Sequence, residues 1–346
     1  MDDGSLIKPC DTSHANACGT LKPRIETMEI YSIETELFKL DGGAMFGVVP
    51  KVLWEKGLPA DENNMCDLAM RLLLVRDGDR LILIDTGIGN KQDDKFFSRY
   101  HLHGPDTLEQ SLHKRGFKKT DITDVFLTHL HFDHGGGAVS KDPVSGELTL
   151  TFPNATYWSN KLHWDWAVHP NAREKASFLS ENLLPLSRSG QLRFLPTHTA
   201  ASDPGDLQEA NPADLSGNGD ADQTTSRLWS SELFSFSENM CYQVVGGHTR
   251  GMMLPYIKIG DRTLVYVTDL IPTMHHFPLP YIASFDVFPL LAMAEKEAFL
   301  KKAVEEQYII YFEHDAVNQC CTVKINEKGK VVPHEIFTLD EFLSHK

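Results

Sequence analysis

Short apolar runs that end in glycine or in polar residues recur along most of the chain. The runs over Asp67–Val75 and Arg80–Ile84 flank Asp77-Gly78, which is a strong signal for a hairpin turn. The other predicted strands are Ile25–Leu40, Asp124–Leu127, Leu148–Phe152, Ala155–Trp158, Leu233–Phe236, Met240–Val245, Leu264–Thr268, Tyr308–Phe312, Thr322–Ile325 and Val331–Phe337. Their lengths and their branched and aromatic residues are typical of strands in a buried sheet.

Segments with a helical period follow several of these strands. They are Asp93–Leu102, Thr107–Arg115, Asn160–Ala167, Asn171–Leu186, Leu290–Gln307 and Leu339–His345. The alternation of strand and helix predicts an α/β fold. The interval Asp41–Pro50 fits neither period, because three glycines are interleaved with Met45 and Phe46. It is either a tight turn or a loop that lays Met45 and Phe46 along the rim of a pocket.

The pattern divides the chain into a tail and one domain. Residues 1–24 show no periodicity and are predicted to be a flexible N-terminal tail. Residues 25–346 form a single predicted domain, interrupted at 199–226 by a segment rich in Asp, Gly, Ser, Ala and Asn. We interpret that segment as an acidic loop insertion.

Composition excludes several classes of protein. A formal net charge of -15 argues against nucleic acid as a partner, because phosphate contacts need clustered Lys and Arg. No apolar run approaches the roughly 20 residues that span a bilayer, and no export signal is visible, so no membrane partner is expected. The six cysteines are then expected to be reduced thiols in a cytoplasmic protein.

The chemistry is concentrated after the strand Asp124–Leu127. His129, His131, Asp133 and His134 fall within six positions, and three glycines follow at once. Imidazole and carboxylate groups suit a borderline cation such as Zn²⁺, Mn²⁺, Fe²⁺ or Co²⁺. The alternative is a histidine-rich surface loop or a set of core histidines, which would be the better interpretation of a single histidine. Four donors packed behind one apolar strand favour a metal site.

The pattern His-x-His-x-Asp-His resembles the signature of the metallo-β-lactamase superfamily of metal-dependent hydrolases. That resemblance implies a four-layer αββα sandwich and demands three more ligands downstream. Candidates are His248 in a Gly-Gly-His-Thr-Arg-Gly turn, Asp269 after the strand Leu264–Thr268, and His314 after Tyr308–Phe312. Arg250 stands where the family often has proline, and Met252 where it often has histidine, but neither change removes a ligand.

The resemblance also implies a role for each candidate. His129, His131 and His248 would hold a first ion, Asp133, His134 and His314 a second, and Asp269 would bridge the two. Two divalent ions per chain are implied, with Zn²⁺ preferred to Mn²⁺, Fe²⁺ or Co²⁺. A hydroxide shared by the ions would attack the substrate, and Asp133 would pass a proton to the leaving group. Asp85, at the end of Arg80–Ile84, either caps a following helix or accepts hydrogen bonds from ligand histidines, and the metal loop favours the latter.

A second resemblance concerns the substrate. The phrase Gly-Ala-Met-Phe-Gly-Val-Val-Pro-Lys with the following Trp54 resembles the branch of N-acyl-homoserine-lactone lactonases of the YtnP type, to which methyl parathion hydrolase is similar. Met45, Phe46, Trp54 and His275 are the candidate residues of a substrate pocket.

The resemblance favours a quorum-quenching lactonase acting on a small lactone or ester, and it is compatible with a homodimer. Alternatives are a phosphotriesterase or arylesterase of the methyl parathion hydrolase type, and a mononuclear iron sulfur dioxygenase. A binding protein without catalysis is a further class, which loss of ligands would have indicated.

Overall fold

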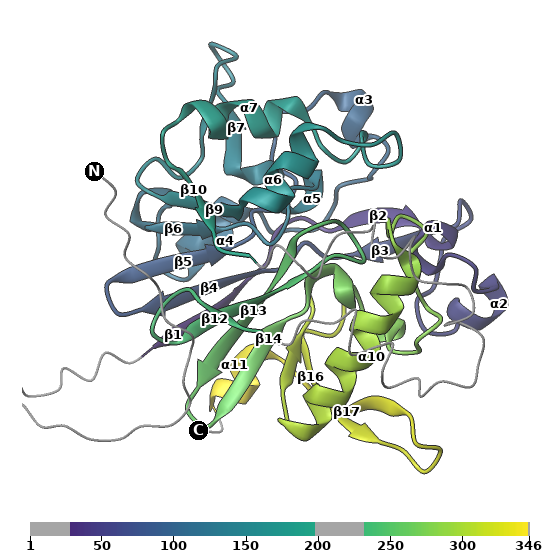
Figure 1. The fold of residues 1–346 in the computed structure, drawn as a ribbon. Helices are drawn as coiled ribbons and strands as arrows, with labels where there is room; N and C mark the ends of the chain where they lie inside the picture. Colours follow the sequence, from purple (N-terminus) through teal and green to yellow (C-terminus); the bar gives the residue numbers. More distant parts are fainter. Residues whose placement is uncertain (1–27, 198–231, 345–346) are drawn as a thin grey trace, which may run out of the picture.

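The computed structural model describes residues 28–197 and 232–344, and two β-sheets form its centre (Figure 1). The first has six strands in the order β1-β4-β5-β6-β9-β10, and the second has seven in the order β11 to β17. The first sheet comprises β1 (Glu29–Ile33), β4 (Leu72–Asp77), β5 (Arg80–Ile84), β6 (Asp124–Phe126), β9 (Thr156–Asn160) and β10 (Leu192–Leu195). The second comprises β11 (Phe234–Ser235), β12 (Met240–Val245), β13 (Met252–Ile259), β14 (Arg262–Tyr266), β15 (Ile309–Tyr311), β16 (Cys320–Ile325) and β17 (Val331–Phe337).

Helices cover the outer faces of both sheets. Side chains of α4 (Leu108–Lys114), α6 (Lys161–Val168) and α7 (Ser180–Arg188) join the core on the outside of the first sheet, and α10 (Pro289–Glu305) packs on the second. The shorter elements are α1 (Gly42–Phe46), α2 (Lys51–Trp54), α3 (Asp94–Phe97), α5 (Phe132–Gly135), α11 (Leu339–Ser344) and the strand pairs β2 (Phe38–Asp41) with β3 (Met65–Leu68) and β7 (Val139–Lys141) with β8 (Leu148–Leu150). The predicted α/β class and the αββα order of layers are confirmed.

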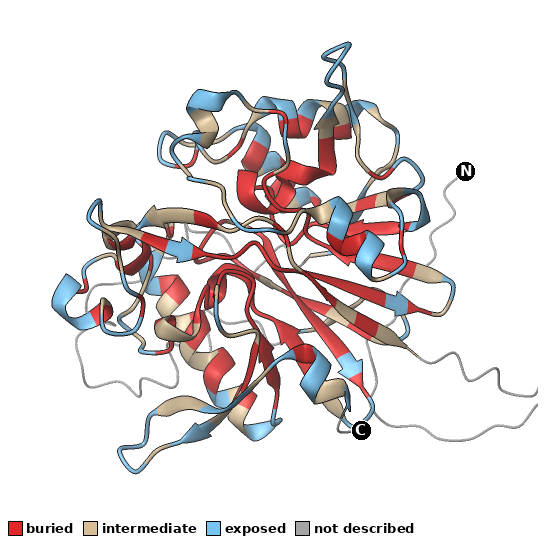
Figure 2. Ribbon diagram, turned by 180° about the vertical axis from the view of Figure 1, so that it is seen from behind, coloured by how far each residue is buried: buried red, intermediate tan, exposed pale blue. Residues whose placement is uncertain are grey.

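The continuous apolar runs of the sequence exist because the strands are buried on both faces. In β4, Leu73 and Val75 point to the core between the sheets, whereas Leu72 and Leu74 point to the outer helices. The strand β15 divides in the same way, with Ile310 in the outer core of the second sheet. Successive side chains of a strand alternate between faces, so a strand covered twice must be apolar throughout. Figure 2 shows this as buried strands through the middle of the molecule.

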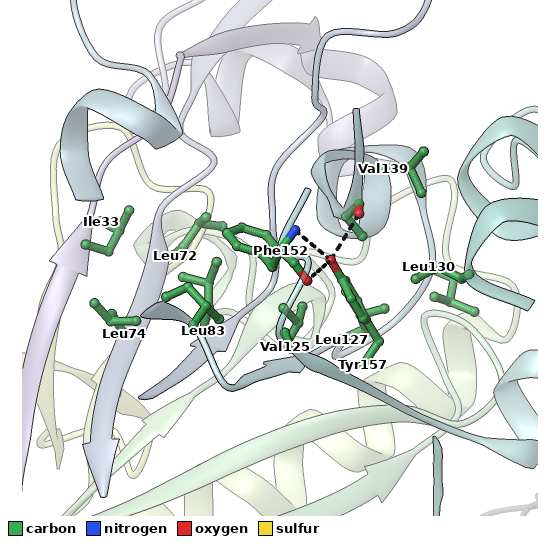
Figure 3. Close-up of a cluster of buried hydrophobic side chains, with 14 of the residues drawn as sticks. Ile33, Leu72, Leu74, Leu83, Val125, Leu127, Leu130, Val139, Phe152 and Tyr157 are labelled. Atoms are coloured by element: carbon green, nitrogen blue, oxygen red, sulfur yellow. Dashed lines mark hydrogen bonds between the residues drawn. The ribbon is translucent and has the colours of Figure 1, made fainter. Parts of the chain in front are cut away.

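A buried polar group, the Tyr157 hydroxyl, lies in the outer core of the first sheet (Figure 3). It accepts a hydrogen bond from the Phe152 N–H at 2.9 Å and lies 3.4 Å from the Ala138 carbonyl. A buried hydroxyl without such partners would cost about 1–3 kcal/mol. Here it ties the β7–β8 hairpin to β9.

Several sequence predictions need correction. The run Asp67–Val75 is divided between β3 and β4 in different sheets, and the strand β13 was not predicted. The predicted strand Ile25–Leu40 is two strands, β1 and β2, in different sheets, because the Thr35 hydroxyl donates to the Met70 carbonyl where the chain turns. Within Asp41–Pro50, the Asp41 carboxylate accepts from the Ala44 N–H and starts the short helix α1. The predicted helix Asp93–Leu102 ends at Phe97. The predicted helix Asn171–Leu186 begins only at Ser180, because the Asn171 side chain accepts backbone N–H groups and forms a turn instead.

Two predicted segments, the tail 1–24 and the acidic insertion 199–226, lie outside the described residues. Within the described part of the chain, no helix combines the length and the apolar composition that crossing a membrane requires.

Asp124, on β6, should make folding stability sensitive to acid. Burial raises the pKa of its carboxyl, but hydrogen bonds from Arg80, Thr123 and Trp158 outweigh burial, and the net pKa lies below 3.8. The carboxylate therefore contributes stability above pH 3.8, and that stability is lost as the pH falls through the folded-state pKa. We expect Asp124→Asn to lower the free energy of unfolding by about 2 kcal/mol at pH 7, less at acidic pH.

Urea unfolding at several pH values measures this difference. Asp79→Asn, at an exposed position in the adjacent β4–β5 turn, is the matched control. Equal losses in the two variants, or a loss for Asp124→Asn that grows as the pH falls, would contradict the prediction.

Candidate metal centre

The histidine loop lies at the carboxyl end of the central strand β6. His129 follows the strand, and His131 precedes α5, whose first turn carries Asp133 and His134. All four side chains are buried or nearly so. The loop can turn this sharply because glycines follow it: a Cβ on Gly137 would lie 2.0 Å from the Thr86 carbonyl oxygen.

The second sheet brings the three downstream residues to the same place. Strands β12, β14 and β15 run in one direction, so their carboxyl ends share one edge of the sheet. His248, Asp269 and His314 follow these three strands respectively. All seven sequence-predicted ligands therefore meet at one point, four from the first sheet and three from the second.

The first cluster consists of His129, His131 and His248. The Nδ1 atom of His131 lies 3.1 Å from Nε2 of His129 and 3.1 Å from Nε2 of His248. Asp269 Oδ2 lies 3.4 Å from the His129 nitrogen and 3.5 Å from that of His248. Two nitrogens bound to one tetrahedral zinc ion lie roughly 3.3 Å apart, so this spacing matches a shared cation.

The second cluster consists of Asp133, His134 and His314. The Nε2 atoms of His134 and His314 are 3.1 Å apart, and each lies 3.9 Å from Asp133 Oδ2. Asp269 touches this cluster too, with Oδ2 at 2.8 Å from His134 and Oδ1 at 3.4 Å from His314. Its carboxylate thus lies between the two clusters.

The outward nitrogens of the histidines show that the inward ones carry lone pairs. His248 Nδ1 donates to Asp286 Oδ1 at 2.7 Å, and His314 Nδ1 donates to the Ala69 carbonyl at 2.8 Å. His134 Nδ1 faces the carboxylates of Asp85 at 3.2 Å and Glu313 at 3.0 Å. A neutral imidazole has one N–H, so with that proton outside, two lone pairs face each other inside the cluster. Only a cation or added protons can relieve that repulsion, so the residues fit a metal.

Electrostatics favour positive charge in the cluster. Burial raises the pKa of Asp269, but His248, His134 and His314 outweigh burial and hold it well below 3.8. Burial lowers the pKa of His314, whereas Asp269 raises it, and the net value is about 9. The ionised carboxylate therefore attracts protons or a cation to the histidine nitrogens.

Asp85 contacts one of the candidate ligand histidines, His134. Its carboxylate accepts hydrogen bonds from the N–H and hydroxyl of Thr128 at 2.8 and 2.6 Å, besides its contact with His134. Its φ of 58° lies in the left-handed region, as does that of Thr268 at 41°, next to Asp269. Strained backbone of this kind is concentrated at functional sites.

The predicted substrate pocket needs correction. Met45, Phe46 and Trp54 are only 1%, 0% and 2% exposed, and Phe46 stacks between Trp54 and His276. Their side chains present almost no surface to a ligand, so they support a wall rather than line it. His275 is partly exposed beside Gly57, while His276 is the buried residue, bound to the Met45 carbonyl at 2.9 Å.

Three further carboxylates contact the candidate ligands, and no sequence pattern predicted them: Glu174 contacts His131, Asp286 contacts His248, and Glu313 contacts His134. Burial raises the pKa of Glu174, but hydrogen bonds from His131, Thr249 and Trp166 lower it to about 2, so the carboxylate stays ionised. Of these three carboxylates, only Glu313 could have been suspected from the sequence, because it is directly adjacent to His314.

Comparisons with known proteins show what the chain is similar to. The family model of the metallo-beta-lactamase superfamily matches residues 72–214. Two proteins described as probable metallo-hydrolases, from Mycobacterium tuberculosis and Mycobacterium bovis, are each 24% identical over 244 residues, which is 65% of this chain. The matched segment spans 66% of each relative, just under two thirds of its length.

Two solved structures share the fold. A probable metal-dependent hydrolase from Staphylococcus aureus has a TM-score of 0.70 at 24% identity, covering 90% of this chain and 98% of that one. AidC, a dizinc quorum-quenching lactonase in complex with a product, has a TM-score of 0.63 at 23% identity, covering 90% and 96%. The protein is an αββα sandwich with a candidate two-metal centre between its sheets. Over residues 72–214 it is similar to the metallo-beta-lactamase superfamily, and its fold is shared with these two solved structures.

The turn that carries His248 depends on a glycine. A Cβ on Gly247 would lie 2.3 Å from the backbone of Ala292 in α10, whereas one on Gly246 would meet no atom closer than 3.6 Å. We therefore expect Gly247→Ala to destabilise the protein by about 1–3 kcal/mol and to displace His248, because α10 cannot move locally. Gly246→Ala is the matched control.

Urea unfolding and zinc titration of both variants test this. If Gly247→Ala is as stable as Gly246→Ala and binds zinc as the wild type does, the close packing has no such importance.

Proposed function

We propose that the protein is a two-metal hydrolase whose substrate is an N-acyl homoserine lactone. The observation that carries the proposal is the pair of donor clusters joined by Asp269, which lies within 2.8–3.5 Å of four histidine nitrogens. His129, His131 and His248 would hold one divalent ion, and Asp133, His134 and His314 the other. Zinc suits the donor set, with Mn²⁺, Fe²⁺ or Co²⁺ as alternatives.

When bound, two such ions lower the pKa of a water molecule and polarise the carbonyl of an ester or lactone. The residues of this chain supply position and proton transfer. Asp269 keeps both clusters together, and Asp85, Asp286 and the Ala69 carbonyl fix the orientation of the ligand histidines. Asp133 is the carboxylate at the more exposed side of the cluster, with 13% of its side chain accessible. It would carry the proton to the leaving alkoxide.

The surroundings of the clusters favour a substrate with an apolar arm. The Phe178 ring lies 4.8 Å from that of His131, and the partly exposed Phe285 lies 6.0 Å from His248. On the other side, Tyr100 packs at 4.6 Å on Phe132. Of these rings, Tyr100 and Phe285 are partly exposed, and aromatic surface suits contact with an acyl chain. AidC, described as a lactonase, also supports this choice over a phosphotriester.

Two alternative functions can be distinguished from the proposed lactonase. A phosphotriesterase or arylesterase would use the same centre, because two ions stabilise phosphoryl and acyl transition states alike. A mononuclear iron sulfur dioxygenase would need only one cluster, and the complete second cluster with its bridging carboxylate disfavours it.

A substrate panel tests the proposal. We expect elemental analysis to find two metal ions per chain, and acid release, followed by pH drift, from homoserine lactones of several acyl lengths. Hydrolysis of paraoxon-like triesters should be much slower. The opposite preference would select the phosphotriesterase, and one iron per chain would select the dioxygenase.

A homodimer in solution, measured by light scattering, is compatible with either hydrolase.

A further inference from the structure

One buried carboxylate connects the two chain segments that supply the first histidine cluster. Glu174 is 2% exposed and lies in the turn between α6 and α7. Its Oε1 accepts from the Thr249 hydroxyl at 2.6 Å and lies 3.4 Å from Nε2 of His131. His131 belongs to the loop after β6, and Thr249 is the residue after His248. Glu174 therefore spans the two segments from the two different sheets.

The other oxygen of this carboxylate is fixed equally well. Glu174 Oε2 accepts from Nε1 of Trp166 at 2.6 Å and from Nδ2 of Asn171 at 2.6 Å. With the proton of His131 on Nε2, every group that faces the Glu174 side chain is a hydrogen-bond donor. A side chain with two acceptor oxygens satisfies all of them, whereas an amide would set an NH₂ group against donors. The surroundings are therefore built for a carboxylate.

A second bridge runs parallel to the first. The Leu130 N–H donates to Nε2 of His163 at 2.8 Å, and Nδ1 of His163 donates to the Arg250 carbonyl at 2.7 Å. Asn160 adds a bond from Nδ2 to the Gly251 carbonyl at 2.7 Å. His163 thus joins the same two segments, residues 129–131 and 248–251, and Asn160 holds the second of them. None of the bonds described for residues 160–178 reaches the side chains of the second cluster.

We propose that Glu174 is a positioning residue for the first cluster: it fixes the orientation of His131 relative to His248 and so sets the affinity of that cluster for its ion. This inference rests on the proposed two-metal function. The carboxylate also fixes which nitrogen of His131 carries the proton. With Nε2–H directed at Glu174, Nδ1 is left as the ligand atom that faces His129 and His248.

Zinc binding by the metal-stripped protein tests this without any assay of turnover. A chromophoric chelator competes for Zn²⁺, and the titration gives an affinity for each ion. Wild type should bind two ions. Glu174→Gln should weaken one of them about 10- to 100-fold and leave the other unchanged. Co²⁺ titration should show the same split, because the absorption of one of the two bound ions alone should change.

Trp166→Phe is the matched control. It removes the hydrogen bond that Trp166 donates to Oε2 of Glu174. The contacts of Oε1 with His131 and Thr249 remain, so both zinc affinities should stay as in the wild type. Glu174→Asp keeps the charge and withdraws it from His131, so it should give an intermediate loss. It also replaces Glu174→Gln if that variant does not fold.

The outcomes separate the two proposals. Two ions bound to wild type, with Glu174→Gln and Glu174→Asp both binding them as tightly, would overturn the role of Glu174 and leave the hydrolase standing. Equal weakening by Trp166→Phe and Glu174→Gln would also overturn it, since the turn alone would then matter. A wild-type protein that binds no zinc or cobalt would overturn the proposed function itself.

Discussion

Replacing His131 by alanine is expected to reduce turnover of the accepted lactone or ester by about 10³-fold or more while the protein stays folded. Metal catalysis supplies several kcal/mol of transition-state stabilisation, and about 4 kcal/mol corresponds to that factor. His131 Nδ1 is the atom nearest to both other nitrogens of the first cluster, so its loss leaves two histidines and the shared Asp269 carboxylate to hold the first ion. Folding should survive, because the substitution also removes a repulsive contact.

Initial rates, zinc content and urea unfolding of the variant measure these effects together. His113→Ala is the matched control, because His113 is exposed on α4. Full activity of His131→Ala would end the proposed mechanism. If the variant loses both activity and folding, the zinc content of its soluble fraction decides the question. That content should fall by one ion per chain if the site is as described.

Replacing Arg71 by methionine is expected to cost about 3 kcal/mol of folding stability, because it leaves buried carbonyl groups and the partly exposed Glu34 without their donor. Arg71 is 3% exposed, and its Nε donates to Glu34 at 2.7 Å. Its Nη1 donates to the carbonyls of Phe312 and Asp315 at 3.0 and 2.8 Å, on either side of His314. Methionine fills the space but leaves these acceptors unpaired. The second zinc ion should therefore also bind more weakly.

Arg76→Met is the matched control for this prediction. Arg76 lies on the same strand, β4, and pairs with Glu29 at 3.0 Å, but about half of each side chain is exposed at 46% and 43%. Exposed pairs contribute roughly 0–1 kcal/mol, so this variant should be close to wild type. Urea unfolding in excess zinc gives both values. Equal losses of unfolding free energy in the two variants would mean that the burial of Arg71 does not increase its contribution to stability.

The sequence predicted most strands of the two sheets, although it missed β10 and β13. Strands covered on both faces are continuous apolar runs, and the donors that follow them must lie at strand ends. Direct adjacency in the chain placed His129 and His134 in one loop. For His248, Asp269 and His314 the prediction came from resemblance, and the shared direction of β12, β14 and β15 is what brings these residues to one edge.

The rest depended on tertiary contacts that leave no local pattern. Glu174 is 43 positions from His131 and 75 from Thr249, so no spacing rule connects them. The residues around Asn171 have a composition typical of a helix. The Asn171 side chain nevertheless accepts hydrogen bonds from backbone N–H groups and forms a turn. Met45 and Phe46 were expected at a rim because glycines surround them, but burial against His276 and Trp54 decides their place.

The division of the donors between the sheets has a consequence for assembly of the molecule. Four come from the first sheet and three from the second, so each bound ion would cross-link the two halves of the chain. Pulling the sheets apart would then require releasing the ions, and the free energy of unfolding would rise with the logarithm of free metal concentration. In a cell that regulates its zinc supply, the resistance of this protein to unfolding would follow metal availability.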